Sequence, residues 1–288
     1  MSEKEMLNAY KARLETYLDA LPMTGAPDKP REAMRYSLLN GGKRLRGCLL
    51  LAANDLGGGD AEAALPFAAA LEMIHAYSLI HDDLPAMDND TLRRGKPTNH
   101  VVYGEALAIL AGDALLTHAV EVMASSGHPQ AFAALGEIIR AAGVGGMLAG
   151  QTLDVMNEGA EPDIALVQEI HQGKTAALLT APVTAGLILA GAEKALVEAG
   201  RAYGCHLGMA FQIVDDLLDL EGDPALMGKT LGKDVEEGKL TWPACVGVAQ
   251  AKRDAKAHIN QAVEALAPFG EKAPFLRALA LSTLHRVQ

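Results

Sequence analysis

Apolar side chains recur every three to four positions in several long segments of this 288-residue chain, a spacing that predicts amphipathic helices. Clusters of glycine and proline separate these segments, and helices are expected to end there. The pattern predicts an all-α fold with ten or more helices. The clearest helical segments are 3–18, 61–81, 131–143 and 251–266.

The composition supports a helical fold. Half of the residues are hydrophobic, and alanine and leucine, which favour helices, are common among them. Aromatic residues make up only 4% of the chain, which argues against a β-sandwich or β-barrel. No serine-, glycine- or proline-rich linker divides the sequence, so we expect residues 1–288 to form a single domain.

Charge and cysteine usage narrow the class of protein. A net charge of −11 argues against nucleic acid or an anionic membrane surface as a partner. Cys48, Cys205 and Cys245 are odd in number and far apart, so they predict neither a disulfide framework nor a zinc site. The N-terminal residues lack the apolar core of a signal peptide. We therefore expect a cytoplasmic protein with reduced thiols.

One uncharged segment, 175–192, is long enough to be considered as a membrane span. It consists mostly of alanine, threonine and glycine and contains Pro182, so we interpret it as a buried core helix. It is the one candidate span that we identify from the sequence.

Two aspartate-rich segments, each at the end of an apolar run, lie about 130 residues apart: LIHDDLPAMDND at 79–90 and FQIVDDLLDL at 211–220. Grouped carboxylates repel one another and need a cation to hold them together. Oxygen ligands without cysteine suit Mg²⁺ or Mn²⁺ rather than Zn²⁺, and Mg²⁺ often completes its shell with substrate phosphates. The alternative is a pair of solvated acidic helix ends, but two such motifs favour a metal-diphosphate cavity.

The spacing within each motif supports a shared site. Asp215 and Asp219 are four residues apart and share one face of a helix, which Gln212 joins three residues before Asp215. Asp82 and Asp88 are six apart, but Pro85 between them breaks the helix and lets the chain bend Asp88 back.

Basic residues supply candidate phosphate ligands. Arg93 and Arg94 directly follow the first motif, and Lys43 and Arg46 share a face if their segment is helical. His75 lies about two turns before Asp82; taken alone, it is more simply a core or dimer-contact histidine. Three isolated cations, each of which could be an ordinary surface residue, are Lys174, Lys229 and Lys239.

The motifs resemble those of the trans-prenyltransferases, specifically the bacterial-type farnesyl diphosphate synthases. GGKRLR, the two aspartate segments, AGDALL, GQTLD, HQGKT, GKTLGKD and GKLTW occur in the family's order over nearly the whole chain. The resemblance implies an isoprenoid-synthase helical bundle around a central cavity, assembled as a homodimer. It also implies condensation of isopentenyl diphosphate with dimethylallyl or geranyl diphosphate to farnesyl diphosphate, through metal-assisted ionisation, condensation and elimination. The resemblance further implies that the released pyrophosphate takes up the proton that is lost in the elimination step.

The same resemblance implies a role for each site residue. Two Mg²⁺ ions, replaceable by Mn²⁺, are held by Asp82, Asp83 and Asp88, and a third is held by Asp215 with Asp216 and Asp219 nearby. The allylic diphosphate is contacted by Arg93, Lys174, Lys229 and Lys239. Isopentenyl diphosphate is held without metal by Gly42, Lys43, Arg46, His75 and Arg94. Thr175 and Gln212 offer dipoles that could stabilise the carbocation and orient the diphosphate. Phe211 is most simply a core residue, and its position before Gln212 also makes it a candidate for the lining of the prenyl channel.

Product length and site closure rest on a few further residues. Tyr77 lies about 7.5 Å before Asp82 along a helix, where its ring can form the floor of the cavity or simply pack in the core. The resemblance implies that an aromatic residue at this position goes with a fifteen-carbon product, and the small Ser78 beside it would not block the chain earlier. The C-terminal LHRVQ is less basic than in many relatives and offers only Arg286 for closing the site.

Four other enzymatic or non-enzymatic classes compete with this interpretation. Geranyl and geranylgeranyl diphosphate synthases differ only in product length. A terpene cyclase typically lacks GGKRLR and replaces the second aspartate motif, and a non-catalytic prenyltransferase subunit usually loses one motif. This chain keeps GGKRLR and both aspartate motifs. Intramembrane prenyltransferases need several membrane spans.

Overall fold

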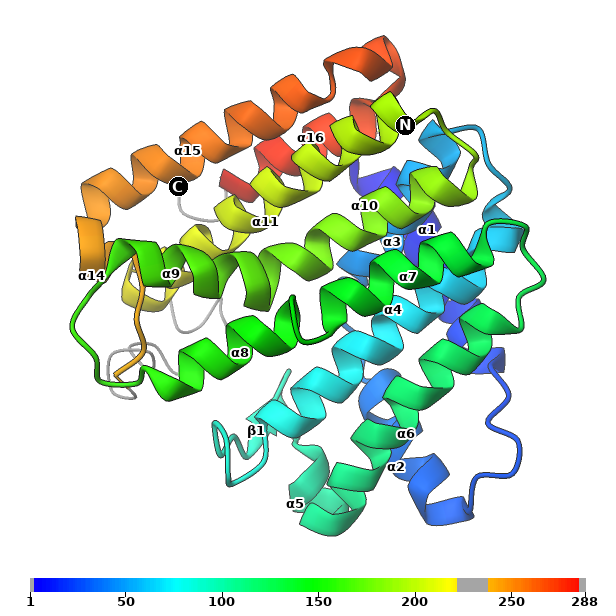
Figure 1. Cartoon of the computed structure of the whole chain (residues 1–288). Coiled ribbons are helices and arrows are strands. Elements are labelled where there is room, and N and C mark those ends of the chain that lie inside the picture. The colour runs from blue at the N-terminus through cyan, green and yellow to red at the C-terminus, as the bar shows by residue number, and fades with distance from the viewer. Residues whose placement is uncertain (1–2, 222–237, 285–288) are drawn as a thin grey trace.

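The computed structural model of the chain describes residues 3–221 and 238–284, and these residues are almost entirely helical (Figure 1). The expected all-α fold with ten or more helices is confirmed. Among the described residues the only sheet is an antiparallel hairpin of strands β1 (Leu92–Arg93) and β2 (Lys96–Pro97), and turns and loops join the helices. The helices are α1 (Glu3–Ala20), α2 (Asp28–Leu38), α3 (Leu45–Leu56), α4 (Ala61–Asp82), α5 (Asn99–Tyr103), α6 (Glu105–Ala124), α7 (Ala131–Ala142), α8 (Met147–Met156), α9 (Ile164–His171), the π-helical turn η1 (Gln172–Ala176), α10 (Ala177–Leu189), α11 (Lys194–Glu221), α14 (Trp242–Val246), α15 (Val248–Ala265), the 3₁₀ turn η2 (Ala267–Lys272) and α16 (Pro274–Leu284).

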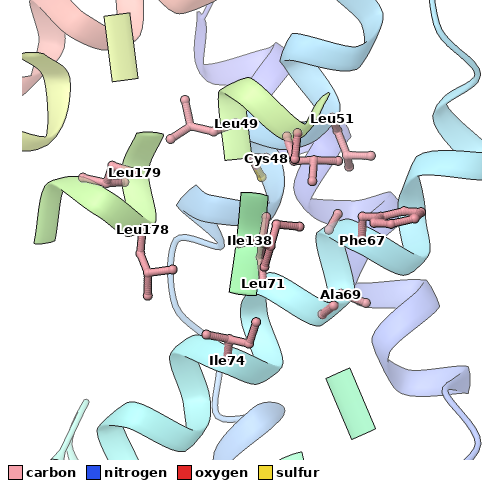
Figure 2. Close-up of a cluster of buried hydrophobic side chains, with 14 of the residues drawn as sticks. Cys48, Leu49, Leu51, Phe67, Ala69, Leu71, Ile74, Ile138, Leu178 and Leu179 are labelled. Carbon is pink, nitrogen blue, oxygen red and sulfur yellow. The ribbon is translucent and has the colours of Figure 1, made fainter. Parts of the chain in front are cut away.

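The main core lies between α3, α4, α7 and α10. Side chains from these four helices meet in the cluster that Figure 2 labels, including Leu49 of α3, Leu71 of α4, Ile138 of α7 and Leu178 of α10. All four are fully buried. Because α4 is buried over most of its length, it can carry the first aspartate motif from the core outward to the site.

The π-helical turn η1 is held between two helices by close backbone approaches. A Cβ on Gly150 of α8 would lie 2.0 Å from the backbone nitrogen of Lys174, and one on Gly208 of α11 would lie 2.4 Å from the Cα of Ala176. Only glycine permits such contacts. The turn is therefore fixed between α8 and α11.

The uncharged segment 175–192 is a core element, as we expected. It forms the end of η1 and the 13-residue α10, most of whose side chains are buried. Our count of candidate spans was wrong, however. By length and composition three other helical stretches could cross a membrane: Ala61–Asp82, Glu105–Ala124 and Ala131–Met156. The first is 72% buried inside the protein, whereas the other two are only 33% and 28% buried.

Candidate active site

The first aspartate motif turns back on itself at the end of α4. The helix ends at Asp82, and the backbone N–H of Asp88 donates to the carbonyl oxygen of Asp82 at 2.9 Å. The bend that Pro85 predicted is confirmed. Gln151 of α8 donates to Oδ1 of Asp82 at 3.0 Å, which fixes this carboxylate from the opposite side.

The carboxylates of this motif lie close together: Asp83 is buried, and Asp82 and Asp88 are half-buried. Burial raises the pKa of Asp82 to about 6; Asp88 and Asp83 add to the rise, and Lys174 and Arg93 oppose it. Burial also raises the pKa of Asp83, although Arg93 stabilises its ionised form through an ion pair of 2.6 Å. The motif is an anionic group that favours additional positive charge.

The β1–β2 hairpin brings two arginines to the site. Its central residues, Arg94 and Gly95, both have positive φ, as a tight type I′ hairpin requires. Arg93 points to Asp83, whereas Nη1 of Arg94 donates to the carbonyl of Gly41 at 2.6 Å. A Cβ on Gly42 would lie 2.6 Å from the same Nη1, so Gly42 lets the guanidinium lie flat on the GGKRLR loop.

A small cavity of about 30 Å³ lies beside this loop, between α2, α4 and the hairpin. Arginines dominate its charge: Arg44, Arg93 and Arg94 all line it. Burial and the arginines around it lower the pKa of His75, which also lines the cavity, well below its usual range. His75 is therefore neutral and can donate an N–H to an anion without adding charge.

The GGKRLR segment is not helical at Lys43, so the condition under which Lys43 and Arg46 would share one helix face is not met. Helix α3 begins only at Leu45, because Arg44 takes a left-handed conformation with φ 52°. Glu72 of α4 holds the loop: Oε1 accepts from the backbone N–H of Gly47 at 3.0 Å, and Oε2 lies 3.6 Å from Nη1 of Arg44.

The second aspartate motif lies on α11. Asp215 and Asp219 are one turn apart on this helix, as their spacing predicted, and Asp219 is buried. Burial lowers the pKa of Arg46, while the carboxylates of Glu72 and Asp215 act in the opposite direction. The charge of Asp215 therefore acts on the GGKRLR segment, and the two sequence motifs face a common region.

A chain of hydrogen bonds joins η1 to α11. Thr175 donates through its hydroxyl to Oε1 of Gln212 at 2.6 Å. Nε2 of Gln212 donates to Oδ1 of Asp216 at 2.9 Å, and the backbone N–H of Trp242 donates to Oδ2 of Asp216 at 2.8 Å. Asp216 thus has partners different from those expected of a metal ligand.

Two of the predicted lysines form ion pairs with carboxylates. Nζ of Lys174 lies 2.6 Å from Oδ2 of Asp154, and Nζ of Lys239 lies 3.2 Å from Oδ1 of Asp88. Lys229 and Arg286 lie outside the described residues. Lys239 reaches the first motif from the segment before α14, whereas Lys174 of η1 pairs with α8 and acts on the first motif through its charge, which lowers the pKa of Asp82.

The predicted chain-length residues lie on the buried part of α4. Tyr77 is 4% exposed, and its hydroxyl has no hydrogen-bond partner among the described residues. Ser78 donates to the carbonyl of His75 in its own helix, so it does not project far. Phe211 packs against the main core from α11.

Sequence reasoning missed the residues that hold the predicted ligands. Gln151 and Asp154 belong to GQTLD and lie five and two residues before the end of α8 at Met156; the sequence alone assigned them no role. Glu72 is a charge within the apolar run 61–81, and His171 begins HQGKT. A buried charge inside an apolar run is a usable signal, since such a residue needs a partner.

The carboxylates fit Mg²⁺ by donor chemistry and charge. They supply only oxygen, and the raised pKa of Asp82 marks a charge that a cation would stabilise. Within residues 3–221 and 238–284, no three histidine, cysteine, aspartate or glutamate side chains already form a group that could hold a metal. Mg²⁺ usually binds one or two carboxylates together with substrate phosphates, so the donor set suits an ion that enters with a diphosphate.

Known proteins share this architecture. Residues 28–273 match the model of the polyprenyl synthetase family. The chain is 45% identical over 275 residues to a dimethylallyltranstransferase of Fischerella ambigua (strain UTEX 1903), covering 94% of this chain and 80% of that protein. It is 43% identical over 268 residues to a farnesyl diphosphate synthase of Geobacillus stearothermophilus, covering 91% and 90%. The solved structure of a geranylgeranyl pyrophosphate synthetase from Pyrococcus horikoshii Ot3 is 31% identical, with a TM-score of 0.89 and coverage of 98% and 99%.

Proposed function

The chain belongs to the polyprenyl synthetase family and is a prenyltransferase; from this premise we propose that it makes fifteen-carbon farnesyl diphosphate. The substrates are isopentenyl diphosphate and either dimethylallyl or geranyl diphosphate. Relatives named for fifteen- and for twenty-carbon products are both similar to the chain, so family membership does not decide the product length. The observation that favours fifteen carbons is Tyr77, a buried aromatic side chain on the helix that leads to Asp82.

Five carboxylates are proposed to hold three Mg²⁺ ions, for which Mn²⁺ can substitute. When bound, the ions supply positive charge that stabilises the diphosphate as it leaves. Asp82, Asp83 and Asp88 act from the end of α4, and Asp215 and Asp219 act from α11.

The protein cations provide the rest of the diphosphate binding. Lys174 and Lys239 pair with carboxylates at the site and can pass to the allylic diphosphate, because both ammonium groups lie near the first motif. Lys229 is proposed as a third contact. Arg94 and neutral His75 line the cavity beside the GGKRLR loop, which suits the diphosphate of isopentenyl diphosphate. Gly42, Lys43 and Arg46 complete that second site.

The chemistry follows from this placement. The C1–O bond of the allylic diphosphate breaks, and its electron pair leaves with pyrophosphate. The double bond of isopentenyl diphosphate then attacks C1 of the allylic cation. A proton passes from C2 of the former isopentenyl unit to the released pyrophosphate. Thr175 and Gln212 present oxygen dipoles that stabilise the cation, while the apolar wall that includes Phe211 excludes water.

The chain is proposed to work as a homodimer of single-domain protomers in the cytoplasm. Helices α5 and α6 expose several large apolar side chains, among them Val101, Val102, Ile109 and Leu110. A second copy that covers this face would remove apolar surface from water. The three cysteines are free thiols, which suits a reducing compartment.

Pyrophosphate release by the purified chain alone tests the proposal. With Mg²⁺, we expect release only when an allylic diphosphate and isopentenyl diphosphate are both present, and EDTA should abolish it. A terpene cyclase would release pyrophosphate from the allylic diphosphate alone, and a non-catalytic subunit would release none. Either result would overturn the proposed function.

A further inference from the structure

Asp216 differs from the other carboxylates of the two motifs in the partners of its oxygens. Oδ1 accepts from Nε2 of Gln212 at 2.9 Å, and Oδ2 accepts from the backbone N–H of Trp242 at 2.8 Å. Nε2 of His171 lies 3.3 Å from the same Oδ2. Each oxygen therefore already faces a protein donor.

The surroundings of Asp216 are apolar. The residue is 3% exposed and lies on α11 among the members of a second buried cluster, which α9, α11, α14 and α15 build. A buried carboxylate is stable there only if it is hydrogen-bonded. Oδ2 lies within reach of two nitrogens, the backbone N–H of Trp242 and Nε2 of His171, which together can use both of its lone pairs. A metal ion on Oδ2 would have to displace one of these buried groups, which costs free energy.

We infer that Asp216 is a positioning residue that orients the Thr175–Gln212 pair and anchors the segment from Lys239 to Trp242, and that it is not a metal ligand. This inference rests on the proposed function, because the groups that it orients are assigned there.

The first arm of this arrangement runs to Thr175. Ionised Asp216 only accepts hydrogen bonds, so the amide of Gln212 must turn its NH₂ toward Asp216 and its oxygen toward Thr175. The hydroxyl proton of Thr175 is then committed to Gln212. The lone pairs of the Thr175 oxygen remain available to a developing cation, and the chain of bonds polarises that oxygen further.

The second arm runs to Lys239. The bond from Trp242 to Asp216 fixes the first residue of α14, whose N-cap Thr241 accepts from the N–H of Ala244. Lys239 lies three residues before Trp242 and pairs with Asp88 of the first motif. Through this segment Asp216 sets how Lys239 approaches the first motif.

The test uses Trp242, the single tryptophan of the chain, as a reporter in the protein free of metal and substrate. The Asp216→Asn substitution places an NH₂ group against one of the donors, so we expect the emission of Trp242 to shift to longer wavelength. The kcat of this variant should fall about ten- to a hundredfold, as expected for loss of a charged hydrogen bond, with the Mg²⁺ concentration for half-maximal rate unchanged. The matched Asp215→Asn control should keep the wild-type emission, and its Mg²⁺ concentration for half-maximal rate should rise at least about tenfold.

The inference would be overturned if Asp216→Asn kept the wild-type emission and needed as much additional Mg²⁺ as Asp215→Asn does. If Asp216→Asn does not fold, the Gln212→Leu variant tests the first arm instead, because it removes the bond to Thr175 and leaves the bond from the Trp242 N–H to Asp216 in place. Its kcat should fall while its Mg²⁺ requirement stays unchanged. Full activity of this variant would contradict the inference. An inactive wild-type enzyme would overturn the proposed function instead, and the emission spectra would still decide whether Asp216 anchors Trp242.

Discussion

Burial and two neighbouring carboxylates raise the pKa of Asp82 to about 6, above the value of about 3.9 that an unfolded aspartate has. The folded protein therefore binds this proton more tightly than the unfolded chain does. The free energy of unfolding therefore falls as the pH rises from about 4 through about 6, because Asp82 must then ionise within the folded protein. Above this range the ionised Asp82 costs on the order of 1 to 2 kcal/mol, allowing for solvent at a partly exposed group.

The Asp82→Asn substitution should separate stability from activity. In EDTA at pH 7.5 we expect its Tm to exceed that of the wild type by about 2 to 4 °C, because the uncompensated charge is gone while Gln151 can still donate to Oδ1. Differential scanning calorimetry at pH 7.5 and pH 4 measures this, and the gain should disappear at the lower pH. With Mg²⁺ the variant should lose kcat by several orders of magnitude. An unchanged or lower Tm at pH 7.5 would contradict the assigned electrostatic cost.

The sequence predicts candidate site residues but not the partners that the structure gives them. The aspartates and cations were predictable because charged groups beside apolar runs have few structural uses. The pairing of Lys174 with Asp154, or of Asp216 with Trp242, depends on contacts between elements far apart in the chain. Nothing in the local spacing distinguishes Asp216 from Asp215, because the difference lies in which side of α11 faces the apolar cluster.

At the scale of elements, the position of Lys174 depends on how tightly η1 packs against α8. Gly150→Ala would insert a methyl group 2.0 Å from the backbone nitrogen of Lys174, and the backbone cannot yield as a flexible side chain would. We expect a loss of about 1 to 3 kcal/mol in the free energy of unfolding and a higher KM for the allylic diphosphate. Urea unfolding and steady-state kinetics measure the two effects.

Gly136→Ala is the matched control for that substitution. Gly136 lies within α7, and an added Cβ would meet nothing within 4 Å. Because alanine favours the helix, the free energy of unfolding should rise by about 0.5 to 1 kcal/mol, with both KM values unchanged. A wild-type KM for the allylic diphosphate in Gly150→Ala would show that η1 tolerates displacement, which would contradict the role of Gly150 in fixing this turn.

The helices themselves could be predicted from the apolar spacing. Segment 61–81 corresponds to α4, and segment 131–143 corresponds to α7 with one residue's difference. Two local features escaped this reasoning. The π-helical turn depends on backbone contacts with α8 and α11, and the start of α3 depends on the positive φ of Arg44, a conformation that an arginine rarely takes.

At the scale of the whole molecule, the exposed apolar face on α5 and α6 predicts association. Leu110 is 55% exposed, so a Leu110→Glu substitution should fold normally as a monomer while preventing a second copy from covering this face. Sedimentation velocity should give twice the monomer mass of 30.2 kDa for the wild type and the monomer mass for the variant. Val144→Glu, on an apolar residue that is 91% exposed beyond the end of α7, should remain dimeric. A monomeric wild type, or a dimeric Leu110→Glu, would contradict the proposed interface.

We expect the enzyme to condense isopentenyl diphosphate with an allylic diphosphate and to stop at fifteen carbons against the side chain of Tyr77. The hydroxyl of Tyr77 has no hydrogen-bond partner within the described residues, so Tyr77→Phe should leave both stability and product length unchanged. Tyr77→Ala removes the ring from the floor and should let the chain grow further.

Chromatography of the dephosphorylated products from geranyl and isopentenyl diphosphate, with Mg²⁺, tests this claim most directly. We expect a fifteen-carbon alcohol from the wild type and from Tyr77→Phe, and products of twenty carbons or more from Tyr77→Ala at a similar rate of condensation. A wild-type enzyme that makes no condensation product would contradict the proposed activity. A folded Tyr77→Ala that still stops at fifteen carbons would show that another residue forms the floor.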